Sequence, residues 1–435
     1  MEYKYTDSLL DFIQASPSCF HVVENFAEAL TARGYTELFE SQSWELSRGE
    51  KYFVRRNGSS IIAFRIPNAE PQGFMMAAAH SDSPTFKVKE NPEKVTDAYV
   101  QLNTEKYGGM LMATWFDRPL SVAGRVITLQ DGRLKTSLVN IDRDLLVIPS
   151  VAIHMNRKAN EGIKYSAAVD TIPLYGSAES AGSFLGLVAE TAGVAEESVV
   201  GSDLFLYCRG RGTRLGAEGE FVISPKLDDL QCAFGCMQGF MDSQDGEAIP
   251  VCCVFDNEEV GSETKQGASS SFLRDTLQRI CRLLGYDDEK LRRLLAQSFF
   301  VSADNAHAKH PNHPEYADRL NCPLMNGGVV VKYHAGQSYA TDGVSSAIFR
   351  RICSEAGVAV QTFANRSDLQ SGSTLGSIAN VLVPVRTVDI GLAQLAMHSA
   401  WETGGAQDFE DLCKLMTLYF SRSIYEDREG IEIRG

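Results

Sequence analysis

The feature that most constrains the fold is a series of short apolar runs of strand length that alternate with helical patterns. The runs cover residues 73–79, 250–255, 298–303, 328–332 and 382–390. Apolar runs of this length are typical of strands that are buried on both faces of a sheet. Helical periodicity occurs in residues 18–33, 271–284, 344–356 and 406–422. Alternation of buried strands with helices indicates an α/β layered fold.

The chain is too long for one hydrophobic core. It has 435 residues, whereas single cores stop growing near roughly 250–300 residues. Residues 91–225 differ from the rest, because they contain short alternating stretches such as 122–128 and 143–153 and only weak helical patterns. We therefore predict a mainly β domain at residues 91–225, inserted into an α/β domain formed by residues 1–90 and 226–435.

Charge and cysteine usage limit the possible partners. The net charge is −15, which argues against a protein that coats nucleic acid or an anionic membrane. No run approaches the ~18 apolar residues of a membrane span, and the polar residues 1–8 do not form a signal peptide. The ten cysteines show no CxxC spacing, which is typical of reduced thiols. We expect a cytoplasmic protein without nucleic-acid or membrane partners.

Residue types that bind metals follow several of the predicted strands. His80-Ser-Asp82 follows 74–79, Glu258-Glu259 comes shortly after 251–255, and Asp304 follows 299–303. His398 comes after 383–390 and a short turn. Ligands bind at the carboxyl ends of strands in open α/β sheets, so these side chains are expected to converge. Asp228-Asp229 precedes an apolar helical run at 230–241 and adds carboxylates to this set.

Two histidines and three carboxylates suit a pair of divalent metal ions. One shared carboxylate can bridge ions ~3.5–4 Å apart. A hydrolytic pair also needs a carboxylate that is not a ligand, and the adjacent Glu258 and Glu259 can divide these two roles. Asp82 lies on the same side of an extended chain as His80, where it can orient the imidazole. Asp228 can alternatively cap the helix that follows it.

A set of ordered motifs identifies a family. The chain resembles the aspartyl aminopeptidase family of co-catalytic metallopeptidases, and the resemblance runs from near residue 15 to near 420. The matching motifs are His80-Ser-Asp-Ser-Pro84, Tyr107-Gly-Gly109, Thr114-Trp-Phe-Asp-Arg118, Leu120-Ser-Val-Ala-Gly-Arg125, Ile153-His-Met-Asn-Arg157, Leu227-Asp-Asp-Leu230, Phe255-Asp-Asn-Glu-Glu-Val-Gly-Ser262, Ala303-Asp-Asn-Ala-His-Ala308, Tyr339-Ala-Thr-Asp342 and Gln394-Leu-Ala-Met-His-Ser399.

The resemblance implies a fold, a cofactor and roles for the site residues. It implies a three-layer αβα catalytic domain with an inserted, mainly β dimerisation domain and two divalent metal ions, zinc or alternatively cobalt or manganese. Glu258 matches the general base and Asp82 the carboxylate that orients a ligand. The ligands of one ion match His80, Asp228 and Asp304, and those of the other match Asp228, Glu259 and His398, with Asp228 bridging.

The resemblance also implies an activity. The family removes an N-terminal acidic residue, Asp or Glu, from peptides, through attack of a metal-bridging hydroxide. It forms a tetrahedral dodecamer built from dimers, in which a histidine matching His154 enters the neighbouring active site. Lys332 and Tyr339 match positions that line the substrate pocket. Asp229 stands where many members carry Asn and is not expected to touch a proposed ligand.

Alternatives remain at this point. The enzyme could be a related di-metal aminopeptidase that prefers neutral residues, or the chain could be a non-catalytic scaffold on the same fold. His154 could be an ordinary surface or core histidine. Lys332 and Tyr339 could simply line a strand edge.

Overall fold

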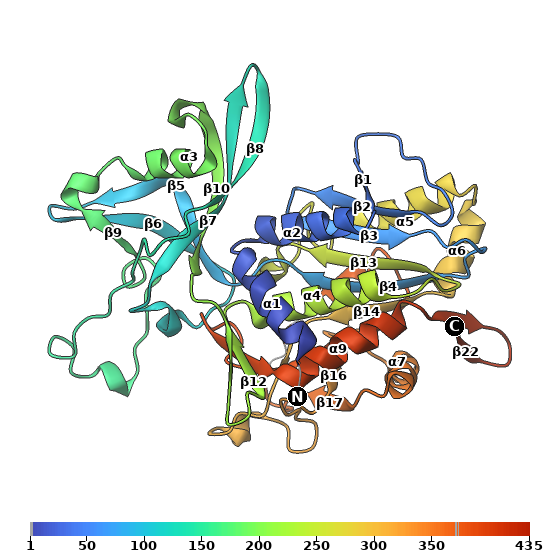
Figure 1. Cartoon of the computed structure of the whole chain (residues 1–435). Helices are drawn as coiled ribbons and strands as arrows, with labels where there is room; N and C mark the ends of the chain where they lie inside the picture. Colours follow the sequence, from blue (N-terminus) through green and yellow to red (C-terminus); the bar gives the residue numbers. More distant parts are fainter. Residues whose placement is uncertain (1–2, 370–371, 373) are drawn as a thin grey trace.

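The structure, a computed structural model, describes residues 3–369, 372 and 374–435. Two lobes lie side by side, and both termini belong to the larger one (Figure 1). The larger lobe is built on a mixed sheet of nine strands in the described residues. In spatial order these strands are β1 (Thr36–Leu38), β2 (Lys51–Arg56), β3 (Ser60–Arg65), β13 (Ile249–Phe255), β4 (Phe74–His80), β14 (Phe299–Ala303), β18 (Arg386–Gly391), β16 (Val329–Tyr333) and β17 (Val360–Ala364).

The centre of this sheet is apolar on both faces. In β4, Met75 and Ala77 enter one hydrophobic cluster, whereas Met76 and Ala78 enter the other. This alternation follows from the two-residue period of a strand. β4 pairs in parallel with β13 on one side and β14 on the other, and β14 pairs in parallel with β18. The carboxyl ends of these four strands therefore lie at one edge of the sheet.

Helices cover both faces of the large sheet. One cluster includes side chains of α1 (Lys4–Ala15), α2 (Cys19–Ala32), α4 (Leu227–Asp242), α7 (Gly343–Ala356) and α9 (Ala406–Tyr419). The other includes side chains of α5 (Phe272–Leu283), α6 (Asp288–Ala296) and α8 (Leu375–Ala379). The predicted three-layer αβα architecture is confirmed. In the described ranges, no helix has the length and apolarity needed to cross a bilayer.

The second lobe has its own antiparallel sheet and core. Its six strands are, in spatial order, β8 (Arg133–Asn140), β7 (Leu120–Gln130), β10 (Val199–Cys208), β5 (Thr85–Val95), β6 (Tyr99–Tyr107) and β9 (Leu174–Ser177). Phe184 and Val188 of α3 (Phe184–Ala192) pack into the core of this sheet.

A smaller sheet joins the C-terminal side of the predicted insertion to the large lobe. Its strands are β11 (Thr213–Leu215), β12 (Phe221–Ser224), β20 (Glu402–Gly405), β19 (Ala393–Leu395) and β15 (Ala306–His307). Strands β21 (Ser423–Glu426) and β22 (Ile431–Arg434) form a hairpin near the C-terminus. The strands of the second lobe thus lie between residues 85 and 208. Strands β11 and β12 also lie within the predicted domain 91–225, but they belong to the smaller sheet, in which β12 pairs with β20.

One stretch of the second lobe differs from the expectation of alternating β structure. Residues 143–153 form only isolated bridges, at Leu146, Val147 and Ile148, and no strand. The chain then continues through exposed turns that carry His154. The alternating pattern arises because Leu146 and Ile148 are buried against the core of the second lobe.

Candidate metal centre

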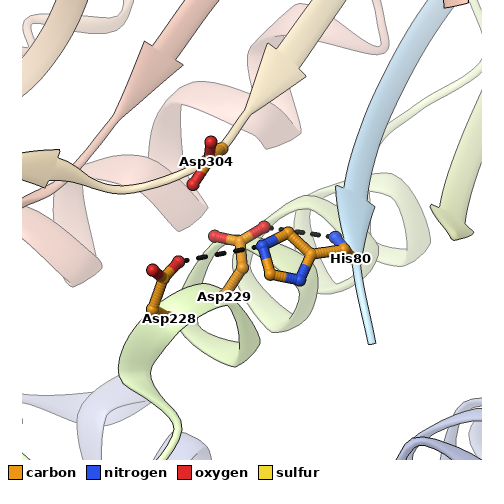
Figure 2. A group of neighbouring side chains, drawn as sticks. All are labelled: His80, Asp228, Asp229 and Asp304. Atoms are coloured by element: carbon orange, nitrogen blue, oxygen red, sulfur yellow. Dashed lines mark hydrogen bonds and ion pairs between the residues drawn. The ribbon is translucent and has the colours of Figure 1, made fainter. Parts of the chain in front are cut away.

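Strand ends and one helix start bring the predicted ligands together. His80 is the last residue of β4, and Asp304 directly follows β14. Asp228 lies at the start of α4, where its backbone dihedral angles are not helical. Figure 2 shows the side chains of His80, Asp228, Asp229 and Asp304 converging from these three elements. Because β4 and β14 are adjacent parallel strands, their carboxyl ends place His80 and Asp304 at the same edge of the sheet.

The donor atoms form three overlapping groups. Within each group one ligand atom per residue lies within 4.8 Å of the others. The groups are His80, Asp228, Asp229 and Asp304; Asp228, Glu259 and His398; and His80, Glu258 and Glu259. The first contains one predicted ligand set with Asp229 added, and the second is the other predicted set. Asp228 is common to both.

The group around His398 is compact. His398 Nε2 lies 3.3 Å from Asp228 Oδ2 and 3.3 Å from Glu259 Oε2. On the other side of the shared carboxylate, His80 Nε2 lies 3.8 Å from Asp228 Oδ1. Asp228 is 2% exposed. The two oxygens of one buried carboxylate therefore face one imidazole each.

The buried oxygens of the centre favour a bound cation. Asp228 Oδ1, Asp229 Oδ1 and Glu259 Oε1 have no hydrogen-bond partner within the described part of the chain. Buried carboxylate oxygens without a partner are costly, and native proteins almost always satisfy them. Imidazole nitrogens and carboxylate oxygens are donors that zinc accepts. The residues present therefore fit divalent metal ions.

The pKa values of the centre reflect its crowded negative charge. Burial, followed by the charges of neighbouring carboxylates, raises the pKa of Glu258 to about 8. Burial and the charge of Asp228 raise the pKa of Glu259 well above its usual value. Burial alone would lower the pKa of His80, but the carboxylates of Asp229 and Asp82 outweigh it and raise that pKa. Divalent ions compete with these protons, so metal binding at this site is coupled to proton release.

Asp82 organises the residues around His80. Its Oδ1 accepts the backbone N–H of Glu258 and its Oδ2 the backbone N–H of Glu259, each at 3.1 Å. His80 Nδ1 lies 3.4 Å from Asp82 Oδ1 and 3.1 Å from the backbone oxygen of Asp82. Asp82 thereby fixes the turn that carries two adjacent glutamates while it contacts the imidazole of His80.

The second lobe reaches the centre through Tyr107, the last residue of β6. Its hydroxyl donates to Asp82 Oδ2 at 2.6 Å and accepts from Asn257 Nδ2 at 2.9 Å. The next residue, Gly108, has φ +75°, and a Cβ there would lie 3.1 Å from Cβ of Glu259. A glycine is needed because the left-handed turn passes so close to Glu259.

Asp229 contacts the centre, contrary to expectation. Its Oδ2 accepts the backbone N–H of His80 at 3.2 Å, and its side chain belongs to the donor group of His80, Asp228 and Asp304. The prediction that Asp229 touches no proposed ligand is therefore wrong. The irregular start of α4 turns this side chain inward, so that it is fully buried.

Lys332 lies beside the metal donors and not at an open strand edge. It is 2% exposed. Its ammonium donates to the backbone oxygens of Asp304 at 2.8 Å and Asn305 at 3.2 Å, and it lies 3.4 Å from Asp304 Oδ2. The ring centroid of Tyr339 is 5.1 Å from the same ammonium. The structure thus groups both predicted pocket residues with Asp304.

His154 is separate from the other predicted site residues. It lies in an exposed turn of the second lobe. The hydrogen bonds and ion pairs found among the described residues link it to none of the residues of the centre.

Sequence reasoning missed Glu402. This carboxylate is 2% exposed and accepts the backbone N–H groups of Asp228 and His398. Its only signal in the sequence is its position four residues after His398, which does not reveal where the side chain points. Tyr107 lies in a recognised motif, but the sequence does not show that its hydroxyl reaches Asp82.

The fold and the donor set define the class of protein. A three-layer α/β fold with histidines and carboxylates at the carboxyl ends of its strands, and with buried carboxylate oxygens that lack partners, is a metal-binding α/β protein. A divalent ion held by these residues would supply an acidified water, which is suited to hydrolysis.

Comparison with known proteins gives the family. The model of the Aminopeptidase I zinc metalloprotease family (M18) matches residues 12–420. A probable M18 family aminopeptidase 2 of Clostridium novyi is 44% identical over 414 residues, which are 93% of this chain and 96% of that protein. The chain belongs to the M18 family of zinc metalloproteases and is a metalloaminopeptidase.

Solved structures agree with this assignment. A structure of the complex of Ape4 and Nbr1 contains a chain with a TM-score of 0.93 and 36% identity, covering 96% of this chain and 85% of that chain. The mApe1 dodecamer of S. cerevisiae gives a TM-score of 0.83 at 28% identity, covering 96% of both chains.

Proposed function

We propose that the enzyme removes N-terminal acidic residues, Asp or Glu, from peptides with two divalent metal ions per chain. Zinc is the proposed ion, and cobalt or manganese are alternatives. The observation that carries the proposal is that Asp228 belongs to two donor groups, one with His80 and Asp304 and one with Glu259 and His398. A carboxylate shared in this way is the arrangement that a two-ion hydrolytic centre requires.

Glu258 is the proposed general base. When bound, the ions would supply an acidified water and stabilise negative charge on the scissile carbonyl oxygen. Glu258 lies outside both groups that share Asp228, so its carboxylate is available to take a proton from the attacking water and deliver it to the leaving amine. In the metal-free chain, burial and neighbouring carboxylates raise its pKa to about 8, and bound cations would favour the ionised carboxylate that accepts a proton. Asp82 positions Glu258 through the backbone.

Lys332 is the proposed source of the preference for acidic side chains. Its ammonium lies beside Asp304 and Tyr339, adjacent to the donor groups. This ammonium already donates hydrogen bonds to two backbone oxygens, and it lies beside one carboxylate. That engagement favours the second candidate function, a di-metal aminopeptidase that prefers neutral residues. A non-catalytic scaffold is disfavoured, because every proposed ligand and the base are present.

We further propose a cytoplasmic homo-oligomer, a tetrahedral dodecamer built from dimers. The mApe1 of S. cerevisiae is a dodecamer. The loop that carries His154 also exposes Val151, Ile153 and Met155, of which Met155 is 83% exposed. Apolar side chains gathered on one exposed loop are typical of a surface that contacts another subunit. In the assembly, His154 would enter the active site of the neighbouring subunit.

Hydrolysis of chromogenic Asp, Glu and Leu amides tests the proposal. The purified enzyme is assayed before and after chelation, and again after zinc, cobalt or manganese is added back. Metal-dependent cleavage that favours Asp or Glu supports both the centre and the pocket. Preference for Leu keeps the centre and refutes the acidic preference, and no cleavage by a metal-loaded oligomer supports the scaffold alternative. Selective loss of Asp and Glu cleavage in Lys332→Ala supports the pocket role, whereas a uniform loss contradicts it.

A further inference from the structure

Glu402 connects two segments that carry proposed ligands of the same ion. It is the first residue of β20 and is 2% exposed. Its Oε2 accepts the backbone N–H of Asp228 at 2.9 Å, and its Oε1 accepts the backbone N–H of His398 at 2.7 Å. One buried carboxylate therefore holds the main chain at both residues.

The smaller sheet brings the two segments together, since Ser224, shortly before Asp228, pairs with Glu402, but neither Asp228 nor His398 is itself a paired residue of that sheet. Asp228 lies 174 residues before Glu402, at the irregular start of α4. His398 lies in the loop between β19 and β20, where its φ of +66° places it in the left-handed region. Non-glycine residues adopt this region at a cost and persist there only when neighbouring contacts hold them. The bond from the N–H of His398 to Glu402 is such a contact.

We infer that Glu402 is a positioning residue that sets the distance between Asp228 and His398 and thereby the affinity of the ion they share. The inference rests on the proposed function, in which Asp228, Glu259 and His398 hold one ion. Metal ligands must keep their distances within a few tenths of an ångström, and partners outside the ligand sphere typically change metal affinity 10–100-fold when mutated. Glu402 acts on the backbone of the ligands and does not itself need to touch the ion.

A carboxylate is required because both of its oxygens accept. In Glu402→Gln, one of the two acceptors becomes an NH₂ donor of nearly the same shape. Whichever way the amide turns, one of the two backbone N–H groups faces a donor. Glu402→Asp keeps both acceptors but is shorter by one methylene, so it loses reach and retains charge.

The chain offers a matched control away from the centre. Asp408 in α9 is fully buried, and its carboxylate accepts the backbone N–H of Asn326 at 2.6 Å and of Gly328 at 2.7 Å. Asp408 belongs to none of the donor groups. Asp408→Asn therefore replaces one of two carboxylate oxygens that accept backbone N–H groups, as Glu402→Gln does. The change at Asp408 affects no proposed metal ligand.

The experiment is calorimetric titration of zinc into the metal-free full chain, for the wild type and both amide variants, with circular dichroism to verify folding. We expect Glu402→Gln to weaken one of the two zinc-binding events about 10–100-fold and Asp408→Asn to leave both unchanged. The absorption spectrum of the cobalt-loaded protein should change in Glu402→Gln only. If Glu402→Gln does not fold, Glu402→Asp is measured in its place, with the same loss of zinc affinity expected.

Two results would overturn the inference. One is unchanged zinc affinity in a folded Glu402 variant, and the other is an equal loss in the Asp408 variant. Failure of the proposed function is distinguishable, because the wild type would then fail to bind two zinc ions at all. In that case both the proposed function and this inference are refuted.

Discussion

Replacing Tyr107 with Phe removes the hydroxyl that joins the second lobe to the centre. That hydroxyl donates to the buried carboxylate of Asp82 at 2.6 Å and accepts from Asn257 at 2.9 Å. A hydrogen bond to a charged group contributes about 1.5–3 kcal/mol and a neutral one about 0.5–1.5 kcal/mol, so we expect the unfolding free energy to fall by about 2–4.5 kcal/mol. Because Asp82 also holds the backbone of Glu258 and contacts His80, we expect zinc affinity to fall by about 10-fold or more.

Urea unfolding of the metal-free chain and zinc titration measure these two effects. Tyr207→Phe is the matched control, because the Tyr207 hydroxyl donates at the same 2.6 Å distance to Asn140, within the second lobe. Since that bond is neutral, its loss should cost only about 0.5–1.5 kcal/mol and leave zinc affinity unchanged. Unchanged zinc affinity in Tyr107→Phe, or equal stability losses in the two variants, would refute the argument that Tyr107 acts through Asp82.

Three further predictions follow from the centre. Glu258→Gln should lower kcat by about 10²–10⁴-fold with two zinc ions still bound, as measured by elemental analysis; loss of an ion would make Glu258 a ligand. Lys332→Met should lower the unfolding free energy of the metal-free chain in urea by about 3–5 kcal/mol, because Asp304 loses its buried cation; a smaller change than 1 kcal/mol would contradict this. Because burial raises the pKa of Glu258 to about 8, the folded chain keeps a proton that the unfolded chain releases near pH 4.5. The unfolding free energy of the metal-free wild type relative to Glu258→Gln should therefore fall by about 1.4 kcal/mol per pH unit between about pH 4.5 and 8, and a difference that rises with pH would contradict the assignment.

The central strands could be predicted from the sequence because they are buried on both faces. Residues 73–79 and 250–255 form β4 and β13 almost as expected. The positions of His80 and Asp304 follow from the same kind of strand, since His80 ends β4 and Asp304 directly follows β14. The run at 382–390 was predicted less well. β18 begins only at Arg386, because Val383 packs against the α5–α8 face before the strand starts.

Other parts of the site depend on contacts that are distant in sequence. Glu402 accepts the backbone N–H of His398, which lies four residues before it and has a left-handed backbone. It also accepts the backbone N–H of Asp228, which lies 174 residues before it. The burial of Lys332 against Asp304 arises only when β16 folds next to β18. Neither periodicity nor a motif specifies such contacts. For the same reason the sequence did not show that Asp229 reaches His80.

The central claim is that Asp228 is shared between two ions. The most direct test of this claim is the number of zinc ions that the metal-free chain binds. Titration of the wild type should show two equivalents per chain. Asp304→Asn and His398→Ala should each weaken a different one, and Asp228→Asn should weaken both. A single equivalent in the wild type, or an Asp228→Asn variant that binds either ion with unchanged affinity, would contradict the shared-carboxylate centre.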